Sequence, residues 1–565
     1  MPCLLGFWKC LGLLVAAATC LVSPARMAEL PTVTVTNRVA ATVDQRIFGQ
    51  FLERASWGES GPEAFVDEET GRLPEDIIAL MKPMRIPLLR FPGGSDVDYI
   101  DWRDLISHAP SRQAVDRPVT IGLTGEPISN RFGLEEFFVL CHQLEAEPLL
   151  VVKTLAAVKE EESLEEVAQQ AAALVAYCNA PLDADLPGDL AAYPAARAQN
   201  GHPDPHGVKL WQVGNELWMI QSTIQEDEAL GLTSDEKVAA RYIEVLTTII
   251  DAMKAVDPDI TILSDGPNRP NSPLSIVASD PAMRQRVDIL TDHAYAPGEM
   301  EPEQSPGSGS DGWADEDYWK IWTAMPGEFD AKGQNIARRS RYEAFARRSK
   351  SAGVTEWNWN GWGDRRLTPQ PGFDPLWAAG LGAAGFIHGM LRNAEYIELA
   401  NQSLLLGHSW DITAIRADPA GISPPGYLPQ GLAMLLHARH HGPSLLISET
   451  RNLATYRQTR KLGWADPPGT VALLDVLATG DPNGTVYLHV INRSWEDDLP
   501  LRVQRKGFDG DLRSIHRFGW QATPSEHPPI VRDVAGITEG HAVKFDPPEP
   551  VLIVPARSMN VYVLK

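Results

Sequence analysis

Short apolar runs alternate with longer amphipathic segments along most of the chain. A short apolar run bounded by turn residues predicts a buried strand, whereas apolar positions spaced three and four residues apart predict a helix. The runs that predict strands are Ile47–Leu52, Pro87–Phe91, Leu149–Lys153, Val208–Val213, Ile260–Ser264, Val287–Thr291, Gly353–Glu356 and Tyr396–Ala400.

Helices are predicted between these strands. Leu164–Cys178 is clearly periodic, and Ser234 is a suitable N-cap for a helix that reaches Val256 and ends before Asp257-Pro258. The alternation of strands and helices indicates the α/β class and fits a (β/α)8 TIM barrel, expected over residues 47–443. A doubly wound sheet would show the same alternation, so the barrel also depends on the motifs described below. Further helices are predicted at Glu75–Met84, Leu134–Leu144, Trp377–Arg392 and Leu428–His441.

Strands dominate the remainder of the chain. Asp481-Pro-Asn-Gly484 lies between two apolar runs and predicts a β-hairpin. Val551–Val554 and Met559–Leu564 predict two more strands, so we expect residues 444–565 to form a C-terminal all-β sandwich domain. Residues 26–46 contain the alternating segment Thr-Val-Thr-Val-Thr, and we expect this N-terminal strand to join the sandwich.

The N-terminus resembles an export signal. Lys9 precedes a short apolar run at residues 11–22, and small residues follow it, which predicts a signal peptide over residues 1–25. The run is shorter than the roughly 20 residues that a membrane span needs. Ala17-Ala-Thr is a poor lipid-attachment signal before Cys20. We therefore expect a secreted or periplasmic protein without a membrane span.

The composition of the chain limits the classes of molecule that it is expected to bind. The net charge of -24 arises from 74 acidic against 50 Lys and Arg residues, and so acidic a surface repels nucleic acid but not a neutral carbohydrate. The 16 tryptophans suit stacking against sugar rings. Cys141 and Cys178 are expected on helices, and one disulfide or two free buried thiols are both open.

Two glutamates occupy matching positions in the sequence. Glu216 ends Trp-Gln-Val-Gly-Asn-Glu, and Glu356 lies in Thr-Glu-Trp-Asn; each follows or ends a predicted strand. In a barrel the catalytic side chains come from the carboxyl ends of the strands. Glycoside hydrolysis needs two carboxylates that flank one sugar. Either glutamate alone could be a solvated or ion-paired residue, but the two together favour catalysis.

Five ordered motifs give the chain a family resemblance. They are Ile47-Phe-Gly-Gln-Phe-Leu-Glu53, Leu89-Arg-Phe-Pro-Gly-Gly94, Trp211-Gln-Val-Gly-Asn-Glu216, Asp292-His-Ala-Tyr295 and Thr355-Glu-Trp-Asn358. With these motifs, residues 32 to 443 resemble a clan-A retaining glycoside hydrolase, and most closely the family-51 α-L-arabinofuranosidases. The resemblance implies an acid/base role for Glu216 and a nucleophile role for Glu356.

The resemblance also implies roles for the surrounding residues. Asn215 would hold the 2-hydroxyl of the sugar, Tyr295 would orient the nucleophile, and Arg90 would lower the pKa of the nucleophile. His293 and Glu53 would line the sugar subsite.

The chain departs from the family at three positions near the sugar. Ser95 stands where the family usually has Asn, and Asp96 follows it. Asp96 could contact a sugar hydroxyl or pair with a neighbouring Arg, and both remain open. Trp359, a candidate substrate contact, and Trp362 also differ from the usual sequence.

The expected function is therefore a secreted retaining exo-glycosidase that acts on plant-type polysaccharide or oligosaccharide by double displacement, as an α-L-arabinofuranosidase. Its carboxyl groups should lie about 5–5.5 Å apart. No metal or organic cofactor is expected for this chemistry. The alternatives are a β-xylosidase, β-glucuronidase or endo-β-glycanase of the same clan, or a non-catalytic carbohydrate-binding protein. Family relatives are often oligomers, so a homo-oligomer is also open.

Three other patterns have plainer explanations. Gly380-Leu-Gly-Ala-Ala-Gly385 matches a dinucleotide fingerprint but lies in a predicted helix, which favours close helix packing. His437 and His441 share a helix face as zinc ligands can, although cations at a helix C-terminus are the plainer interpretation. Pro297–Gly312 predicts a surface loop, or a rim over the site.

Overall fold

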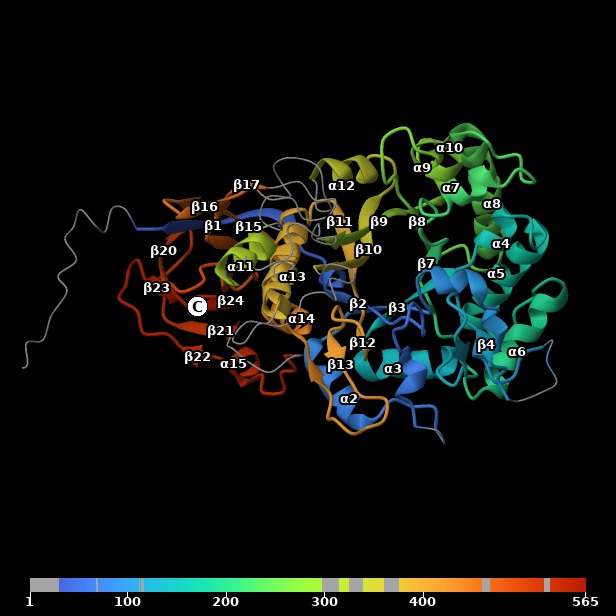
Figure 1. Cartoon of the computed structure of the whole chain (residues 1–565), viewed down its shortest axis with the longest axis horizontal. Coiled ribbons are helices and arrows are strands. Elements are labelled where there is room, and N and C mark those ends of the chain that lie inside the picture. Colours follow the sequence, from blue (N-terminus) through green and yellow to red (C-terminus); the bar gives the residue numbers. More distant parts are fainter. Residues whose placement is uncertain are drawn as a thin grey trace, which may run out of the picture.

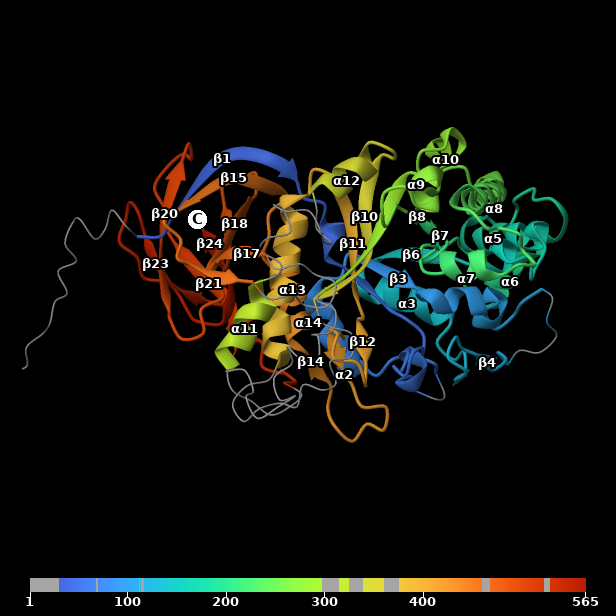
Figure 2. The same cartoon turned by 45° about the horizontal axis from the view of Figure 1, so that its top comes forward.

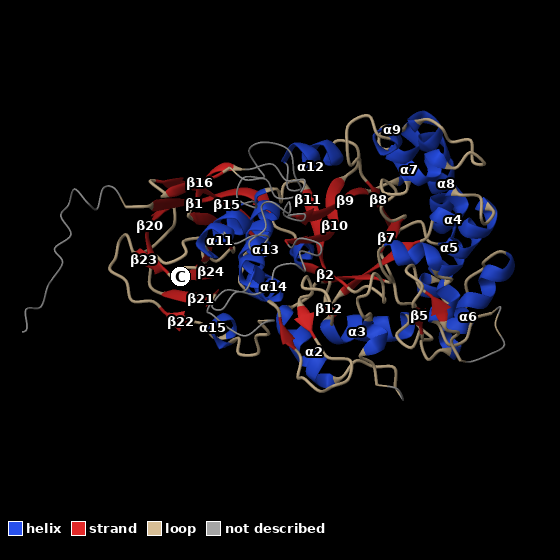
Figure 3. Cartoon of the chain, viewed as in Figure 1, coloured by secondary structure: helices blue, strands red, loops and turns tan. Residues whose placement is uncertain are grey.

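The computed structural model describes two parts that lie side by side, a barrel surrounded by helices and a mostly β domain (Figures 1 and 3). The signal peptide predicted over residues 1–25 and the loop predicted at 297–312 lie outside the described residues. Those described are 30–67, 70–110, 112, 116–296, 315–324, 339–359, 375–459, 468–522 and 529–565.

The barrel is closed and its neighbouring strands are parallel. The last strand pairs with the first, where Asn401 lies opposite Gly49, so the sheet has no free edge. This confirms the (β/α)8 prediction and excludes a doubly wound sheet. In barrel order the strands are β2 (Gly49–Phe51), β3 (Leu88–Phe91), β6 (Glu147–Val152), β7 (Leu210–Val213), β8 (Thr261–Asp265), β9 (Ile289–Ala296), β10 (Ser351–Trp359) and β11 (Ile397–Ser403).

Inward-pointing aliphatic side chains fill the barrel. Leu88, Leu149, Leu263 and Leu399 belong to one buried cluster, each from a different strand. Gly353 on β10 faces the same space, because a Cβ atom there would lie only 3.0 Å from Leu399 Cδ1. The barrel interior is therefore a packed core, and chemistry is confined to the carboxyl ends of the strands.

The helices begin where side chains satisfy their first amides. Ser163 caps α5 (Leu164–Asn179) in a capping box with Glu166, and Ser234 caps α8 (Asp235–Val256). The other long helices of the described chain are α3 (Leu134–Leu144), α13 (Pro375–Arg392) and α14 (Pro429–Arg439), with the shorter α2 at Glu75–Met81.

Helices α13 and α14 lie between the barrel and the β domain in both views (Figures 1 and 2). The glycine motif is inside α13, and a Cβ atom on Gly380 would come within 2.5 Å of Pro429 Cβ. Close packing of two helices therefore explains the glycine, as the sequence interpretation expected.

The segment of residues 183–205 is rich in alanine and proline. It contains α6 (Ala192–Gln199), which packs beside α5. Arg197 of α6 is buried and donates to the carbonyl oxygens of Tyr177 and Ala180. An alanine-rich stretch with one buried anchor has enough propensity to form a short helix.

Nine strands of the β domain form one hydrogen-bonded sheet. Its strand β1 (Thr32–Thr42) comes from the N-terminus and pairs antiparallel with β15 and parallel with β20. Buried residues from β1 through β24 share one hydrophobic cluster, so the sheet must fold over on itself. The order is β22 (His541–Ala542), β21 (Ile515–Gln521), β24 (Ser558–Leu564), β19 (Val486–Asn492), β18 (Leu474–Gly480), β15 (Ser444–Arg451), β1, β20 (Leu499–Lys506) and β23 (Val551–Val554).

Both cysteines in the described chain, Cys141 and Cys178, are buried and free, which decides between the two alternatives left by the sequence. Within the described residues, no helix has the length and apolar character needed to cross a bilayer.

Candidate active site

The two glutamates stand at the carboxyl ends of the fourth and seventh barrel strands. Glu216 follows β7 in a tight turn, where its φ of 51° and the φ of 86° at Gly214 are both left-handed. Glu356 lies within β10, and the register with β9 slips between Val354 and Glu356. Such an irregularity re-aims a strand side chain. Both carboxylates thereby face the same end of the barrel.

His293 of β9 connects the two carboxylates. Its Nδ1 lies 2.8 Å from Glu216 Oε1 and 3.4 Å from Glu356 Oε2. One carboxylate oxygen of each glutamate lies within 4.8 Å of the other. The fold therefore joins two segments that are 140 residues apart in sequence.

Glu356 is buried among groups that favour its charged form. Arg90 Nη1 donates to Oε1 at 2.8 Å, and the Tyr295 hydroxyl donates to Oε2 at 2.8 Å. Burial alone would raise the pKa of Glu356, but the charges of His293 and Arg90 and the hydrogen bond from Tyr295 outweigh it and lower the pKa. Glu356 is therefore an oriented carboxylate.

Arg90 is fully buried and organises the floor of the site. Its Nε donates to Gln212 Oε1 at 3.0 Å and its Nη2 to Asn215 Oδ1 at 2.8 Å, while the guanidinium lies 4.4 Å from the centre of the Phe51 ring. One arginine thus fixes the nucleophile candidate and Asn215 together.

Glu53 follows β2 and lies close to Glu356. It accepts a hydrogen bond from Gly94 N at 3.2 Å, yet burial and the charge of Glu356 raise its pKa to about 8. Glu53 is therefore protonated at neutral pH and can donate to a sugar hydroxyl. A Cβ atom on Gly94 would lie 3.0 Å from Glu53 Oε1 and 3.2 Å from Glu356 Oε1.

Ser95 and Asp96 point to different surroundings. Ser95 Oγ lies 3.4 Å from Asn215 Nδ2 and so faces the site. Asp96 is fully buried, 3.3 Å from Arg54 Nη1, and accepts a hydrogen bond from Leu123 N at 3.0 Å. Of the two alternatives for Asp96, the structure shows the ion pair, because both carboxylate oxygens are engaged within the protein. The side chain of Trp359 lies outside the described residues.

Sequence reasoning missed four residues around the site. Gln212 holds Arg90, and Thr355 Oγ1 lies 3.2 Å from His293 Nε2. Asp265 ends β8, and its Oδ2 accepts a hydrogen bond from Leu217 N at 2.9 Å, which fixes the turn after Glu216. The Trp218 ring meets His293 edge-on at 5.1 Å. The sequence signal that could have identified such a residue is a polar side chain inside an apolar run, as at Gln212.

Comparisons with known proteins agree with this geometry. The family model for the alpha-L-arabinofuranosidase 1 domain matches residues 80–305. The intracellular exo-alpha-(1->5)-L-arabinofuranosidase of Acetivibrio thermocellus is 27% identical over 41% of each chain. Enzymes of the same name are 24% identical over 83% of this chain, covering 65% of the Streptomyces lividans protein and 85% of the Halalkalibacterium halodurans protein. The chain thus spans less than two thirds of the length of the first two relatives.

Solved structures share the fold. The thermostable alpha-L-arabinofuranosidase from Thermotoga petrophila aligns with a TM-score of 0.67 at 20% identity over 95% of this chain and 100% of that one. The arabinofuranosidase from Xanthomonas axonopodis pv. citri aligns with a TM-score of 0.66 at 19% identity over the same shares. Identities this low speak for the fold alone.

A closed parallel barrel with two carboxylates at the carboxyl ends of its strands is the arrangement expected of a clan-A retaining glycoside hydrolase. The family model and the curated relatives confirm the resemblance of this chain to arabinofuranosidases, and the solved structures of family 51 share its fold.

The expectation of a secreted or periplasmic protein is wrong by the same comparison. The relatives from Streptomyces lividans, Halalkalibacterium halodurans and Bacillus subtilis are all named intracellular enzymes. A short apolar run beside one lysine is a weak signal, and these names contradict the location inferred from it.

Proposed function

We propose that the protein is a retaining exo-acting α-L-arabinofuranosidase. The observation that supports it most is the approach of the two carboxylates, since one oxygen of each lies within 4.8 Å of the other. Retaining enzymes hold their carboxyl groups about 5–5.5 Å apart, whereas inverting enzymes leave about 6.5–9.5 Å for a water molecule. The names of the curated relatives favour arabinofuranose as the sugar, because these relatives are named arabinofuranosidases.

The reaction follows from the positions of these groups. Glu356 attacks the anomeric carbon and forms a glycosyl ester, while Glu216 gives its proton to the departing glycosidic oxygen. Glu216 then takes a proton from water, which attacks the same carbon and releases Glu356. Arg90 and Tyr295 hold the nucleophile in place, and Asn215 and protonated Glu53 are positioned to bind sugar hydroxyls.

Substitution of the two glutamates separates their roles. We expect Glu356→Ala to lower turnover of a nitrophenyl arabinofuranoside by roughly 10⁴-fold or more. Glu216→Ala should cost about 10²–10⁴-fold, least for the best leaving groups, and added azide should restore turnover with a product of retained configuration. Proton NMR of the first sugar released by wild type tests the stereochemistry; inverted arabinose would contradict the proposal.

The other sugar specificities of clan A remain alternatives, because Ser95 replaces the Asn that the family usually has near the sugar. A panel of nitrophenyl glycosides distinguishes them: turnover of a β-xyloside or β-glucuronide with none of the arabinofuranoside would reject the sugar but keep the mechanism. If Glu216→Ala and Glu356→Ala match wild type on every glycan, the protein is a non-catalytic binder.

A further inference from the structure

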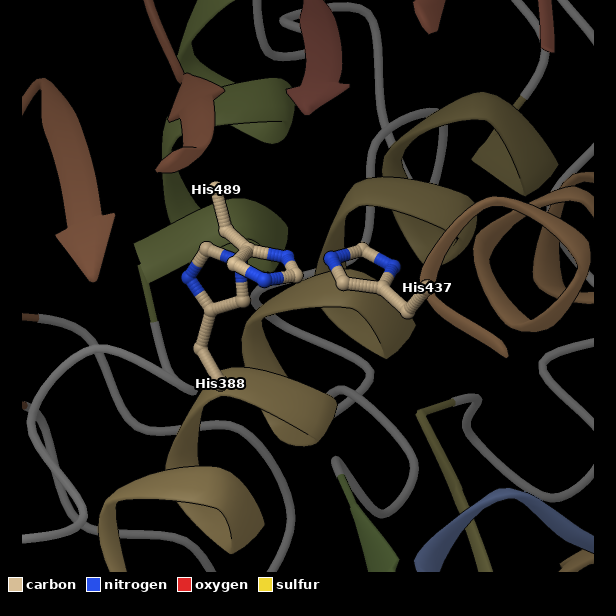
Figure 4. Close-up of side chains that lie close together, drawn as sticks. All are labelled: His388, His437 and His489. Carbon is tan, nitrogen blue, oxygen red and sulfur yellow. The ribbon is translucent and has the colours of Figure 1, made fainter. Parts of the chain in front are cut away.

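Three histidines meet where the barrel joins the β domain. His388 lies on α13, His437 on α14 and His489 on β19, and their rings face one another across a small gap (Figure 4). All three are buried, with exposed fractions of 0%, 1% and 0%. The ring centres are 5.3 to 6.0 Å apart. Three separate elements therefore contribute one imidazole each to a single point.

One nitrogen of each ring lies close to an oxygen atom of the protein. His437 Nδ1 lies 2.7 Å from the carbonyl oxygen of Ala433, and His489 Nε2 lies 3.1 Å from Thr479 Oγ1. His388 Nδ1 lies 3.2 Å from the carboxylate of Asp475. Carbonyl, hydroxyl and carboxylate oxygens are the partners that orient metal-bound histidines, because they fix the ring and leave the other nitrogen unprotonated.

The other nitrogen of each ring is buried without a hydrogen-bond partner among the described residues. These atoms are His388 Nε2, His437 Nε2 and His489 Nδ1. Buried polar atoms in folded proteins almost always have a partner, so three orphans at one place require an explanation. One possible ligand atom from each histidine lies within 4.8 Å of the others.

We propose that His388, His437 and His489 bind a divalent transition-metal ion, with zinc the best fit, that fastens the β domain to the barrel. Imidazole nitrogen suits zinc, and three histidines leave a fourth tetrahedral position for water. Zinc–nitrogen bonds of about 2.0–2.1 Å would draw the rings closer together on binding. The ion has no part in the glycosidase chemistry.

Electrostatics of the cluster agree with metal binding. Burial and the neighbouring rings lower the pKa of His437 to about 3 and lower that of His489, and burial lowers that of His388. The imidazoles are therefore neutral at pH 7, the form that binds metal. This corrects the interpretation of His437 as a cation at a helix end. His441 instead packs against Phe48 with its ring tilted by 43°, and it is not part of the cluster.

The full-length protein tests the site directly. Expressed with zinc in the medium and passed through a desalting column, it should carry about one zinc per chain by mass spectrometry of the metals. A strong chelator should remove the ion and lower the melting temperature, and added zinc should restore it in a concentration-dependent way. Cobalt substitution should give the intense visible bands of a tetrahedral site. A chain without metal that gains neither stability nor these bands overturns the proposal.

Variants locate the ion in the cluster. His437→Gln should abolish stoichiometric binding, and Thr479→Val, which removes only the oxygen beside His489, should weaken zinc affinity about 10–100-fold. His440→Gln is the matched control, because His440 is similarly buried but bonds to the carbonyl oxygen of Ile537. If His437→Gln does not fold, the Thr479→Val affinity decides. Unchanged affinity in Thr479→Val, or equal loss in His440→Gln, would reject the cluster as the site.

Discussion

At the residue scale, the site shifts the pKa values of two neighbouring carboxyl groups in opposite directions. Glu356 has a lowered pKa because Arg90 and His293 face it, whereas burial and the charge of Glu356 raise the pKa of Glu53 to about 8. Carboxyl groups with opposite shifts can serve different purposes at one pH. One is a charged nucleophile candidate and the other a neutral donor.

Glu53→Gln tests this separation through pH-dependent stability. A carboxyl whose folded pKa is raised from 4.5 to about 8 stabilises the fold most below its unfolded pKa, and this contribution is lost as pH rises towards 8. Gln keeps a neutral donor without that loss. We therefore expect the melting temperature of Glu53→Gln relative to wild type to rise between about pH 5 and pH 9. Glu63→Gln is the control that tests whether replacing any buried glutamate gives the same pH-dependent change in melting temperature. A pH-independent difference between Glu53→Gln and wild type would contradict the raised pKa.

The sequence was sufficient to place most of the site residues but not their orientation. Glu216, Glu356 and Arg90 stand in recognisable motifs at strand ends, so their convergence follows once the barrel closes. The direction of Asp96 could not be predicted, because it depends on Arg54 and the Leu123 amide from other loops. Such pairings are tertiary and leave no local pattern.

At the element scale, apolar runs located all eight barrel strands within a few residues, because each strand is buried on both faces. The pattern could not reveal the slip in register at Glu356 in β10, which arises from pairing with β9. It also could not show that nine strands of the β domain form one folded sheet, since each strand alternates in the same way in either arrangement.

The segment after β3 must pass close to the carboxylates without a side chain. Gly94→Ala should therefore lower kcat/KM by about 10-fold or more while changing the melting temperature little, because its methyl group would crowd Glu53 and Glu356. Gly93→Ala is the neighbouring control, since a Cβ atom there meets Glu53 Cγ at an ordinary 3.5 Å. Steady-state kinetics and thermal melts compare the two variants. Equal activity of Gly94→Ala and Gly93→Ala would show that activity does not depend on the close approach of Gly94 to the carboxylates.

The N-terminal strand β1 is integral to the β domain. Val33 is fully buried between β15 and β20, so Val33→Ala should cost about 1–3 kcal/mol of unfolding free energy by leaving a cavity. Val39 lies on the same strand but is 56% exposed, and Val39→Ala should change stability by no more than about 0.5 kcal/mol. Urea denaturation measures both, and similar costs would mean that β1 is not held by its buried face.

At the scale of the whole molecule, one buried carboxylate connects the barrel to the β domain. Asp475 of β18 pairs with Arg392 of α13 and lies 2.8 Å from Arg493 Nη2. Arg493 in turn donates to the carbonyl oxygen of Thr323 on α11 (Asp315–Ala324). Because the barrel helix and the β domain share these charges, the two parts should resist separation.

Asp475→Asn should weaken this junction. Removing the charge leaves the buried Arg493 and the partly buried Arg392 without their counter-ion, which should cost about 3–5 kcal/mol of unfolding free energy at pH 7. Both arginines hold the pKa of Asp475 well below its usual value, so its stabilisation is complete above about pH 4 and is lost as pH falls further. The difference between wild type and variant should therefore shrink only under acid conditions. Glu449→Gln is the control, because Glu449 forms an exposed pair with Arg451 worth about 0–1 kcal/mol. A difference between wild type and Asp475→Asn that stays constant down to about pH 3 would show that the lost charge is not the cause.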